Sequence, residues 1–226
     1  TVKLVAEKSG SEKFAYDSYR RFIHMYGDVV MGVEAEEGEH DPFEQVLDGI
    51  RDAKNYKSDA ELTAGDLKVV VEKYKAVVKE KAGREFPTNP WDQLWGAICA
   101  VFDSWNTERA ILYRRMEQIP DEWGTAVNVQ AMVYGNMGET SATGVCFSRD
   151  AATGENIVAG IRPPQEITLE GSKRWAERNG TSEEERKAKF PSLEEAMPAI
   201  YNELFETQQK LEKHYKDMQD MEFTIQ

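Results

Sequence analysis

Apolar residues in the first part of the chain recur at spacings of three and four, the pattern of amphipathic helices. A first helix is predicted over residues 14–33. The sequence Asp-Pro-Phe-Glu from Asp41 supplies an acidic N-cap and a proline at the first helical position, so a second helix starts there. A third is predicted over residues 63–81, with Gly83 as its C-terminal stop. We expect the last two helices to pack together as an antiparallel helical arm.

Further along the chain the repeat changes from helical to strand-like. Asn89 caps a helix and Thr107 caps a shorter one. Residues 125–134 then alternate apolar and polar positions with a period of two, which predicts a strand. A glycine-rich turn at 135–139 and a second strand at 143–149 complete a predicted hairpin. The large apolar residues of the helix after Asn89 share one face: Leu94, Ile98, Val101, Phe102 and Trp105.

The end of the chain combines a helix and a strand. A capping box at Ser192 opens a helix that we expect to reach about Lys216. Residues 220–225 alternate, so as a strand they present Asp220 and Glu222 together on one face. The apolar members would face a core: Met221, Phe223 and Ile225.

These patterns predict an α+β fold with two parts. Residues 1–88 form a helical arm or subdomain, and residues 89–226 form a sheet with flanking helices. Residues 170–189 are highly charged and contain a run of glutamates. We interpret them as an exposed insertion rather than a folded unit.

The composition argues against two classes of partner, nucleic acids and membranes. The chain has 226 residues with 28 Lys+Arg against 41 Asp+Glu, a net charge of −13, which argues against a nucleic-acid partner. Its content of 40% hydrophobic and 31% charged residues is typical of a soluble globular protein. We expect no membrane partner, since no apolar run approaches the roughly 20 residues that cross a bilayer. Cys99 and Cys146 lack ligand spacing and are interpreted as free core thiols in a reducing, intracellular compartment.

Acidic and basic side chains are the candidates for chemistry. Two carboxylates at i and i+2 of a strand, Asp220 and Glu222, suit Mg²⁺, although spacing alone favours a charged edge strand. Several arginines could bind phosphate or could line solvated helix edges: Arg20, Arg21, Arg109, Arg114 and Arg115. The histidines show no metal-ligand spacing and no nucleophile motif: His24, His40 and His214.

Four stretches of the chain resemble the nucleotide-binding part of pyruvate phosphate dikinases. They are Phe14 to Tyr26 with its Tyr-Asp-Ser-Tyr-Arg-Arg, residues 101–115, residues 123–145, and the ending from Leu211 to Ile225. The resemblance implies an ATP-grasp-like region of a longer enzyme that interconverts ATP, phosphate and pyruvate with AMP, pyrophosphate and phosphoenolpyruvate. It also implies Mg²⁺, a swivelling phosphohistidine domain of the same enzyme, a homodimer, and a cytoplasmic or organellar location (glycosome or plastid).

The resemblance also assigns roles to residues of this chain. Asp220 and Glu222 match the family's metal-binding and nucleotide-binding acids, and Arg21 matches a catalytic arginine on the phosphate side. A strand resembling the hinge against which adenine lies, and the turn after it, add further nucleotide-binding residues: Gln130, Met132, Val133 and Gly138.

Three departures from the family pattern follow from the same resemblance. The chain starts after the position of the family's glycine-rich phosphate loop and stops before its Gln-x-Arg. After Glu155 a strand and an acidic turn are absent, either deleted or left out of the chain, unless Glu155 is itself the last of the missing acids. We therefore expect this chain alone to be inactive and to bind Mg-ATP weakly or not at all.

Two other functions remain open from the sequence. One is a non-catalytic helical interaction module whose acidic faces bind a partner. The other is a fragment of a phosphoenolpyruvate synthase, which the stretch ending at Arg21 disfavours. A thermal-shift scan with Mg-ATP separates the first from a nucleotide-binding domain, because a ligand that binds the folded state raises the melting midpoint.

Overall fold

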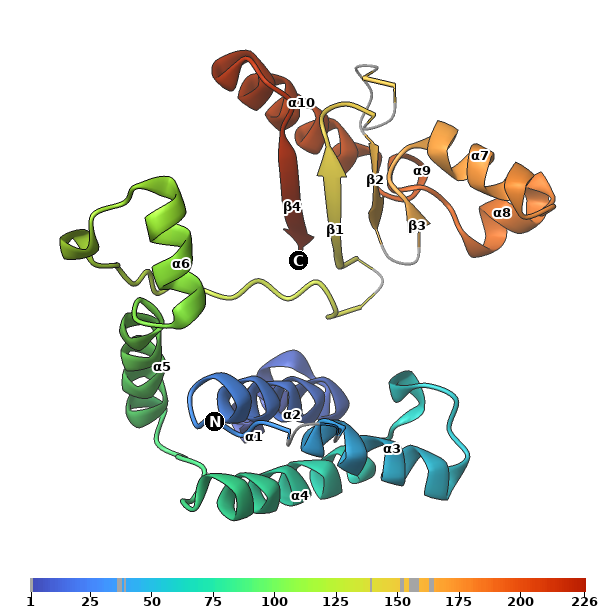
Figure 1. Cartoon of the computed structure of the whole chain (residues 1–226). Helices are drawn as coiled ribbons and strands as arrows, with labels where there is room; N and C mark the ends of the chain where they lie inside the picture. Colours follow the sequence, from blue (N-terminus) through green and yellow to red (C-terminus); the bar gives the residue numbers. More distant parts are fainter. Residues whose placement is uncertain are drawn as a thin grey trace. The chain divides into compact units, whose positions relative to one another are not determined.

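The computed structural model of the chain describes residues 2–35, 38, 40–138, 140–150, 153–154, 159–162 and 165–226. The chain divides into two compact units, Thr1–Gln130 and Ala131–Gln226. Figure 1 shows helices in the first unit and a small sheet with helices in the second, which confirms the predicted α+β class. Glu155, the possible last acid of the missing turn, lies outside the described residues.

The first unit is helical. Its elements are α1 Val2–Ser9, α2 Glu12–Val29, α3 Pro42–Lys54, α4 Ala64–Ala82, α5 Pro90–Ser104 and α6 Glu108–Glu117, with short 3-10 helices at Asp59–Glu61 and Asp121–Trp123. The second unit contains β1 Ala142–Phe147, β2 Ala159–Arg162, β3 Gln165–Glu166, α7 Leu169–Arg178, α8 Glu183–Lys189, α9 Leu193–Ala196, α10 Pro198–Tyr215 and β4 Asp220–Ile225.

The predicted helix starts in the first unit are confirmed by their caps. The carboxylate of Asp41 accepts hydrogen bonds from the backbone N–H groups of Phe43 and Glu44 at 2.8 and 2.9 Å. Thr63 and Asp66 form a capping box at the start of α4, and Gly83 ends that helix with a φ of +67°. These local signals are strong because each satisfies backbone groups that a helix end leaves unpaired.

Helices α3 and α4 pack against each other as expected, and they share their core with α2; an arm formed by residues 1–88 stays a prediction. Helix α4 packs against both α2 and α3, and one core holds side chains of all three. The rings of Phe43 and Tyr74 lie 5.0 Å apart, and Ile23 and Tyr26 from α2 complete the same core. Helix α2 needs this cover, because its apolar stripe would otherwise face water.

Helix α5 joins the first unit through its small residues. Ala97 packs against the core, and Gly96 lies so close to Tyr26 that a Cβ atom there would be 2.1 Å from the phenolic oxygen. The contacts therefore group α5 and α6 with the helices, whereas the sequence grouped residues 89–226 with the sheet. The division at residue 88 stays a prediction for the complete enzyme.

The second unit is built on an antiparallel sheet in the order β3-β2-β1-β4. The β1–β4 register pairs Ala142 with Ile225 and Phe147 with Asp220. One face packs on the helices around buried Cys146, Ile167 and Leu193. Strand β4 was predicted from its alternation and β1 as the second strand of a hairpin, and the burial of side chains alternates along both.

The predicted hairpin of residues 125–134 with β1 does not form. Residues 125–134 belong to no strand and pair with none of the strands in the described part of the chain, and Val129, Met132 and Val133 are exposed. Strand β1 instead pairs with β2 on one side and β4 on the other, so both of its edges are occupied. The strand predicted over residues 125–134 is therefore absent, because a period of two in the sequence does not supply a partner strand.

The helix predicted to run from Ser192 to Lys216 is interrupted. The capping box between Ser192 and Glu195 is present, but α9 ends at Ala196. Pro198 then begins α10, since proline lacks the N–H that would continue a helix and is favoured at a first helical position. The left-handed residue Lys216 ends α10 where the sequence predicted.

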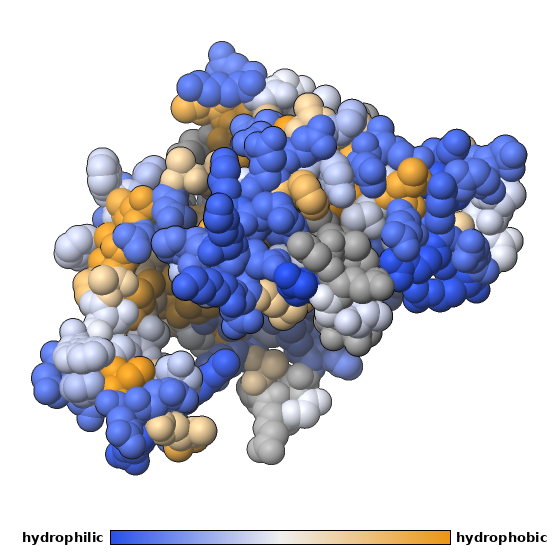
Figure 2. Space-filling view, turned by 90° about the horizontal axis from the view of Figure 1, so that it is seen from above, coloured by the Kyte–Doolittle hydropathy of each residue, from blue (hydrophilic) through white to orange (hydrophobic). Residues whose placement is uncertain are grey.

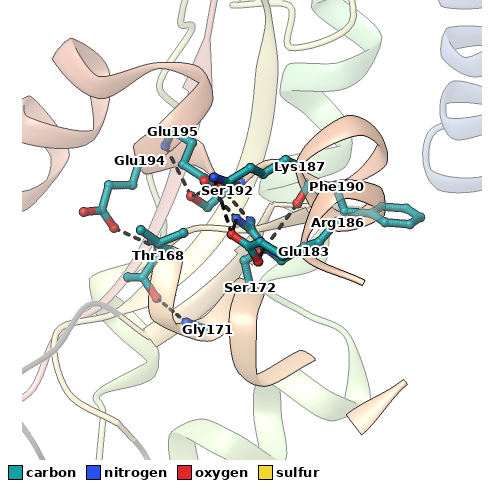
Figure 3. Close-up of polar contacts among 11 residues, drawn as sticks. Thr168, Gly171, Ser172, Glu183, Arg186, Lys187, Phe190, Ser192, Glu194 and Glu195 are labelled. Atoms are coloured by element: carbon teal, nitrogen blue, oxygen red, sulfur yellow. Dashed lines mark hydrogen bonds and ion pairs between the residues drawn. The ribbon is translucent and has the colours of Figure 1, made fainter. Parts of the chain in front are cut away.

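Residues 170–189 are folded, contrary to the sequence interpretation. Helices α7 and α8 occupy this stretch, and Arg186 is fully buried between them and α9. Its guanidinium donates to both oxygens of Glu195 at 2.8 and 2.9 Å and to the hydroxyl of Ser172 at 2.9 Å (Figure 3). Glu183 accepts two further hydrogen bonds from the same group. The charged composition thus reflects a paired network rather than an unfolded segment.

The two cysteines differ in their exposure to solvent. Cys146 is buried as predicted, and burial, with the nearby charge of Asp220, raises the pKa of its thiol to about 11. Cys99 is exposed, so its prediction as a core thiol is wrong; it lies on α5, whose large side chains do not cover it. Within the described residues no helix combines the length and apolar character needed to cross a membrane.

Replacing Arg186 with Met should destabilise the second unit. The Arg186 guanidinium holds the pKa of Glu195 at about 2, below its ordinary value of 4.5, so this pair contributes stability above pH 4.5 that is lost as the pH falls toward 2. Arg186→Met should cost on the order of 2 kcal/mol at neutral pH and flatten this acid dependence. Hydrogen exchange of α7 and α8 across this pH range measures both the loss of stability and its pH dependence. The control Lys187→Met, at an exposed weak pair, should change neither quantity; an equal effect there would refute the assignment.

Gly96→Ala tests the contact between α2 and α5. Alanine normally stabilises a helix interior by about 1 kcal/mol relative to glycine. Here the new methyl meets the Tyr26 oxygen, so we expect a destabilisation of about 1–2 kcal/mol in denaturant unfolding. In a Tyr26→Phe background that oxygen is gone and the same substitution should become neutral or stabilising. If Gly96→Ala destabilised the protein equally with Tyr26 and with Phe at position 26, the contact would not be the cause of the loss.

Candidate functional site

Strand β4 presents two carboxylates on the open face of the sheet. Asp220, Glu222 and Thr224 are exposed, while the residues between them are half-buried. Directly opposed residues of an antiparallel pair share a face, so Glu222 lies beside Val145 and Asp220 beside Phe147. The predicted placement of both acids on one face is confirmed.

The opposite face of β4 holds the strand in place. Met221, Phe223 and Ile225 pack against the core of the second unit. A groove of about 510 Å³ runs between β4 and α10, lined by residues that include Leu204, Leu211 and Phe223. Because these apolar side chains must face the core, a slip of the strand by one residue would move the acids inward, and the register is therefore strongly fixed.

A buried polar cluster anchors the start of β4. The backbone carbonyl of Ser148 accepts a hydrogen bond from Gln208 at 3.0 Å, and its hydroxyl accepts one from the backbone N–H of Gln219 at 2.9 Å. Arg149 forms an ion pair with Glu212, and hydrogen bonds from Ser148 and Arg149 lower the pKa of that carboxyl. The cluster joins β1, α10 and the entry to β4. Sequence reasoning missed it, because its members are far apart in the chain and each looks ordinary alone.

The acids fit a magnesium ion that is completed by phosphate. Mg²⁺ usually takes one or two carboxylates and fills its other positions with water and substrate phosphates. Asp220 and Glu222 supply such a pair on one face. Among the described residues no group of three or more His, Cys, Asp or Glu side chains that could hold a metal occurs.

The adjacent arginines of α2 have different environments. Arg20 is buried and donates to Asp17 at 2.8 Å and Asp59 at 3.1 Å, which assigns it to the fold rather than to phosphate. The Arg21 side chain is 61% exposed, and its described ion-pair partner is Asp17, at 3.0 Å. Arg21 belongs to the first unit and Asp220 to the second, so their union in one site stays a prediction.

The segment predicted as the adenine hinge is exposed and forms no strand. Gln130, Met132 and Val133 are exposed and belong to no strand, and Gly138 has a φ of +154° with no other heavy atom near its Cβ position. One described contact links this segment to β4: the backbone N–H of Tyr134 donates to the side-chain oxygen of Gln226 at 2.9 Å. The segment thus ends beside the end of the acidic strand, while its nucleotide role stays a prediction.

The arginines of α6 also separate into two kinds. Arg114 is buried, stacks over the Trp105 ring at 4.0 Å and pairs with Asp121 at 2.7 Å, so it holds α6 to the following turn. Arg109 and Arg115 are exposed, and within the described part of the chain neither has an ion-pair partner.

Comparisons with known proteins point in one direction. The family model described as "Pyruvate phosphate dikinase, AMP/ATP-binding domain" matches residues 57–226. The chain is 48% identical to a pyruvate, phosphate dikinase of Clostridium symbiosum, 45% to one of Rhizobium meliloti and 46% to a chloroplastic one of Mesembryanthemum crystallinum. Each match covers the whole chain.

The chain is much shorter than these relatives. It spans 24%, 25% and 22% of their respective lengths. The alignment with the Clostridium protein extends over 240 residues, more than the 226 of this chain, so that relative contains residues without a counterpart here.

If the acids serve a ligand rather than the fold, their removal should leave stability unchanged. Asp220→Asn and Glu222→Gln alter exposed side chains and should shift the free energy of unfolding by less than about 0.5 kcal/mol. Met221→Asp, between them on the buried face, should instead cost about 2 kcal/mol or more. Chemical denaturation measures all three, and a large loss for either amide variant would indicate a structural role.

Proposed function

This chain belongs to the AMP/ATP-binding domain family of pyruvate phosphate dikinases, and from this premise we propose that it is the nucleotide-binding part of such an enzyme. That enzyme would interconvert ATP, phosphate and pyruvate with AMP, pyrophosphate and phosphoenolpyruvate. Family membership favours this function over an acidic interaction module, and relatives that are named dikinases favour it over a phosphoenolpyruvate synthase.

The observation that supports this proposal best is the pair of carboxylates on β4. Asp220 and Glu222 are exposed on one face and are held there by apolar residues on the other. In an ATP-grasp-like arrangement this face would receive the triphosphate. A bound Mg²⁺ would neutralise phosphate charge, which is the main requirement of phosphoryl transfer.

Other residues would position the nucleotide. Arg21 can offer a guanidinium to phosphate, because its side chain is 61% exposed although it pairs with Asp17. The segment with Gln130, Met132 and Val133 would lie along adenine, with Gly138 in the turn that follows. Exposed backbone and side chains in this segment leave it free to contact a ligand.

The partners and location are part of the same proposal. A phosphohistidine on a swivelling domain of the same enzyme would take the pyrophosphoryl group, and the complete enzyme would be a homodimer. None of His24, His40 and His214 shows the carrier motif. The bacterial and chloroplastic relatives support a cytoplasmic or organellar enzyme.

Glu222→Gln in the full-length enzyme should separate the two half-reactions. Loss of one charge beside the phosphates should remove about 2–4 kcal/mol of transition-state stabilisation, hence a ~10²–10³-fold slower formation of AMP. Phosphate exchange between the carrier histidine and phosphoenolpyruvate, at a distant site, should be unaffected.

The matched control is Glu206→Gln, an exposed glutamate on α10, which should leave both rates unchanged. Equal loss of both half-reactions in Glu222→Gln would mean misfolding. Normal AMP formation would show that the acids only protect an edge strand.

A further inference from the structure

Asp17 forms hydrogen bonds with both of the adjacent arginines of α2. One carboxylate oxygen accepts the Nε–H of Arg20 at 2.8 Å, and the other oxygen accepts the Nε–H of Arg21 at 3.0 Å. Residues three and four positions apart are neighbours on the surface of a helix, so one turn of α2 brings the three charges together. The carboxylate therefore links a buried arginine to an exposed one.

The buried arginine holds this carboxylate in place. The Arg20 side chain is 5% exposed and also donates to Asp59 at 3.1 Å, which in turn accepts a hydrogen bond from Arg51 of α3 at 3.0 Å. Burial alone would lower the pKa of the Arg20 guanidinium, but the charge and hydrogen bond of Asp17 outweigh burial and the pKa lies above its ordinary value. Separating a buried ion from its partner is costly. Asp17 is thus fixed from the inside of the fold.

The exposed arginine is held at one nitrogen and open at the other two. Its contact with Asp17 uses Nε, and within the part of the chain that the structure describes the two terminal nitrogens of Arg21 have no hydrogen-bond partner. A guanidinium carries N–H donors on all three nitrogens. The bond to Asp17 therefore leaves the donors of both terminal nitrogens for a phosphate.

Exposure alone does not distinguish Arg21 from other surface residues. Figure 2 shows hydrophilic side chains over much of the surface seen from above. A long charged side chain on a surface loses rotamer freedom when a ligand fixes it. Because Asp17 restricts Arg21 before a ligand binds, part of this entropic cost is met by the fold itself.

We propose that Asp17 is a positioning residue for phosphoryl transfer, which holds the Arg21 guanidinium with its terminal N–H groups available to the phosphates of the nucleotide. The inference rests on the proposed function, in which Arg21 lies on the phosphate side of the site. Asp17 acts through Arg21 and does not itself contact the nucleotide. The two adjacent arginines then have different roles, since Arg20 anchors the carboxylate and Arg21 presents its charge to the ligand.

Asp17→Asn in the full-length enzyme tests the proposal. The amide keeps the shape of the side chain but has one acceptor oxygen, so it cannot accept hydrogen bonds from both arginines. AMP formation should slow by about tenfold or more, because a misplaced group loses its effect on the transferring phosphate. Phosphate exchange between the carrier histidine and phosphoenolpyruvate should be unaffected.

Two further variants serve as controls on the same helix. Asp17→Glu keeps both acceptor oxygens and should restore most of the rate of AMP formation. Asp28→Asn removes an exposed carboxylate of α2 and should leave that rate unchanged. Slow AMP formation in Asp28→Asn as well would assign the effect to the charge of the helix and overturn the proposal.

The Arg21→Met background separates positioning from folding. The arginine that Asp17 positions is absent there, so adding Asp17→Asn should slow AMP formation further by less than about twofold. An equal loss in both backgrounds would show that Asp17 supports only the fold, which would overturn the positioning role while leaving the proposed function intact. Normal AMP formation in Arg21→Met alone would instead refute the phosphate-side role of Arg21, and the inference with it.

Discussion

The antiparallel pairing of β4 with β1 is the constraint on which the candidate site depends. It fixes the register, and the apolar residues Met221, Phe223 and Ile225 fix the face. Because side chains alternate along a strand, Asp220 and Glu222 must point to the face opposite that core. The buried cluster around Ser148 then sets where β4 begins. Position and orientation of the two carboxylates thus follow from packing that never touches them.

Features encoded by neighbouring residues could be predicted from the sequence. The caps at Asp41 and Thr63 and the capping box of Ser192 with Glu195 are interactions within one helical turn, so the residues alone specify them. The alternation of β4 is equally local. The acids of the candidate site were found for this reason, since their common face needs only the period of a strand.

Features that depend on distant partners could not be predicted. The segment ending at Tyr134 has the pattern of a strand, but both edges of β1, its expected partner, are taken by strands from later in the chain. From the sequence, Arg186 was interpreted as part of a solvent-exposed charged stretch. In the structure it donates hydrogen bonds to Glu195 and Ser172. Arg20 likewise resembled a phosphate ligand, although Asp59, 39 residues away, pairs with it. Charge composition cannot distinguish a paired ion from a free one.

The central claim is that β4 carries the metal of a nucleotide site, and metal-directed backbone cleavage tests it most directly. The full-length enzyme is loaded with ATP and Fe²⁺ in place of Mg²⁺, and ascorbate with peroxide then cuts the chain near the bound ion. We predict cuts at Asp220 to Glu222 and at the facing residue Val145, which disappear without ATP and in Glu222→Gln. Cleavage confined to other segments, with β1 and β4 intact, would contradict the account.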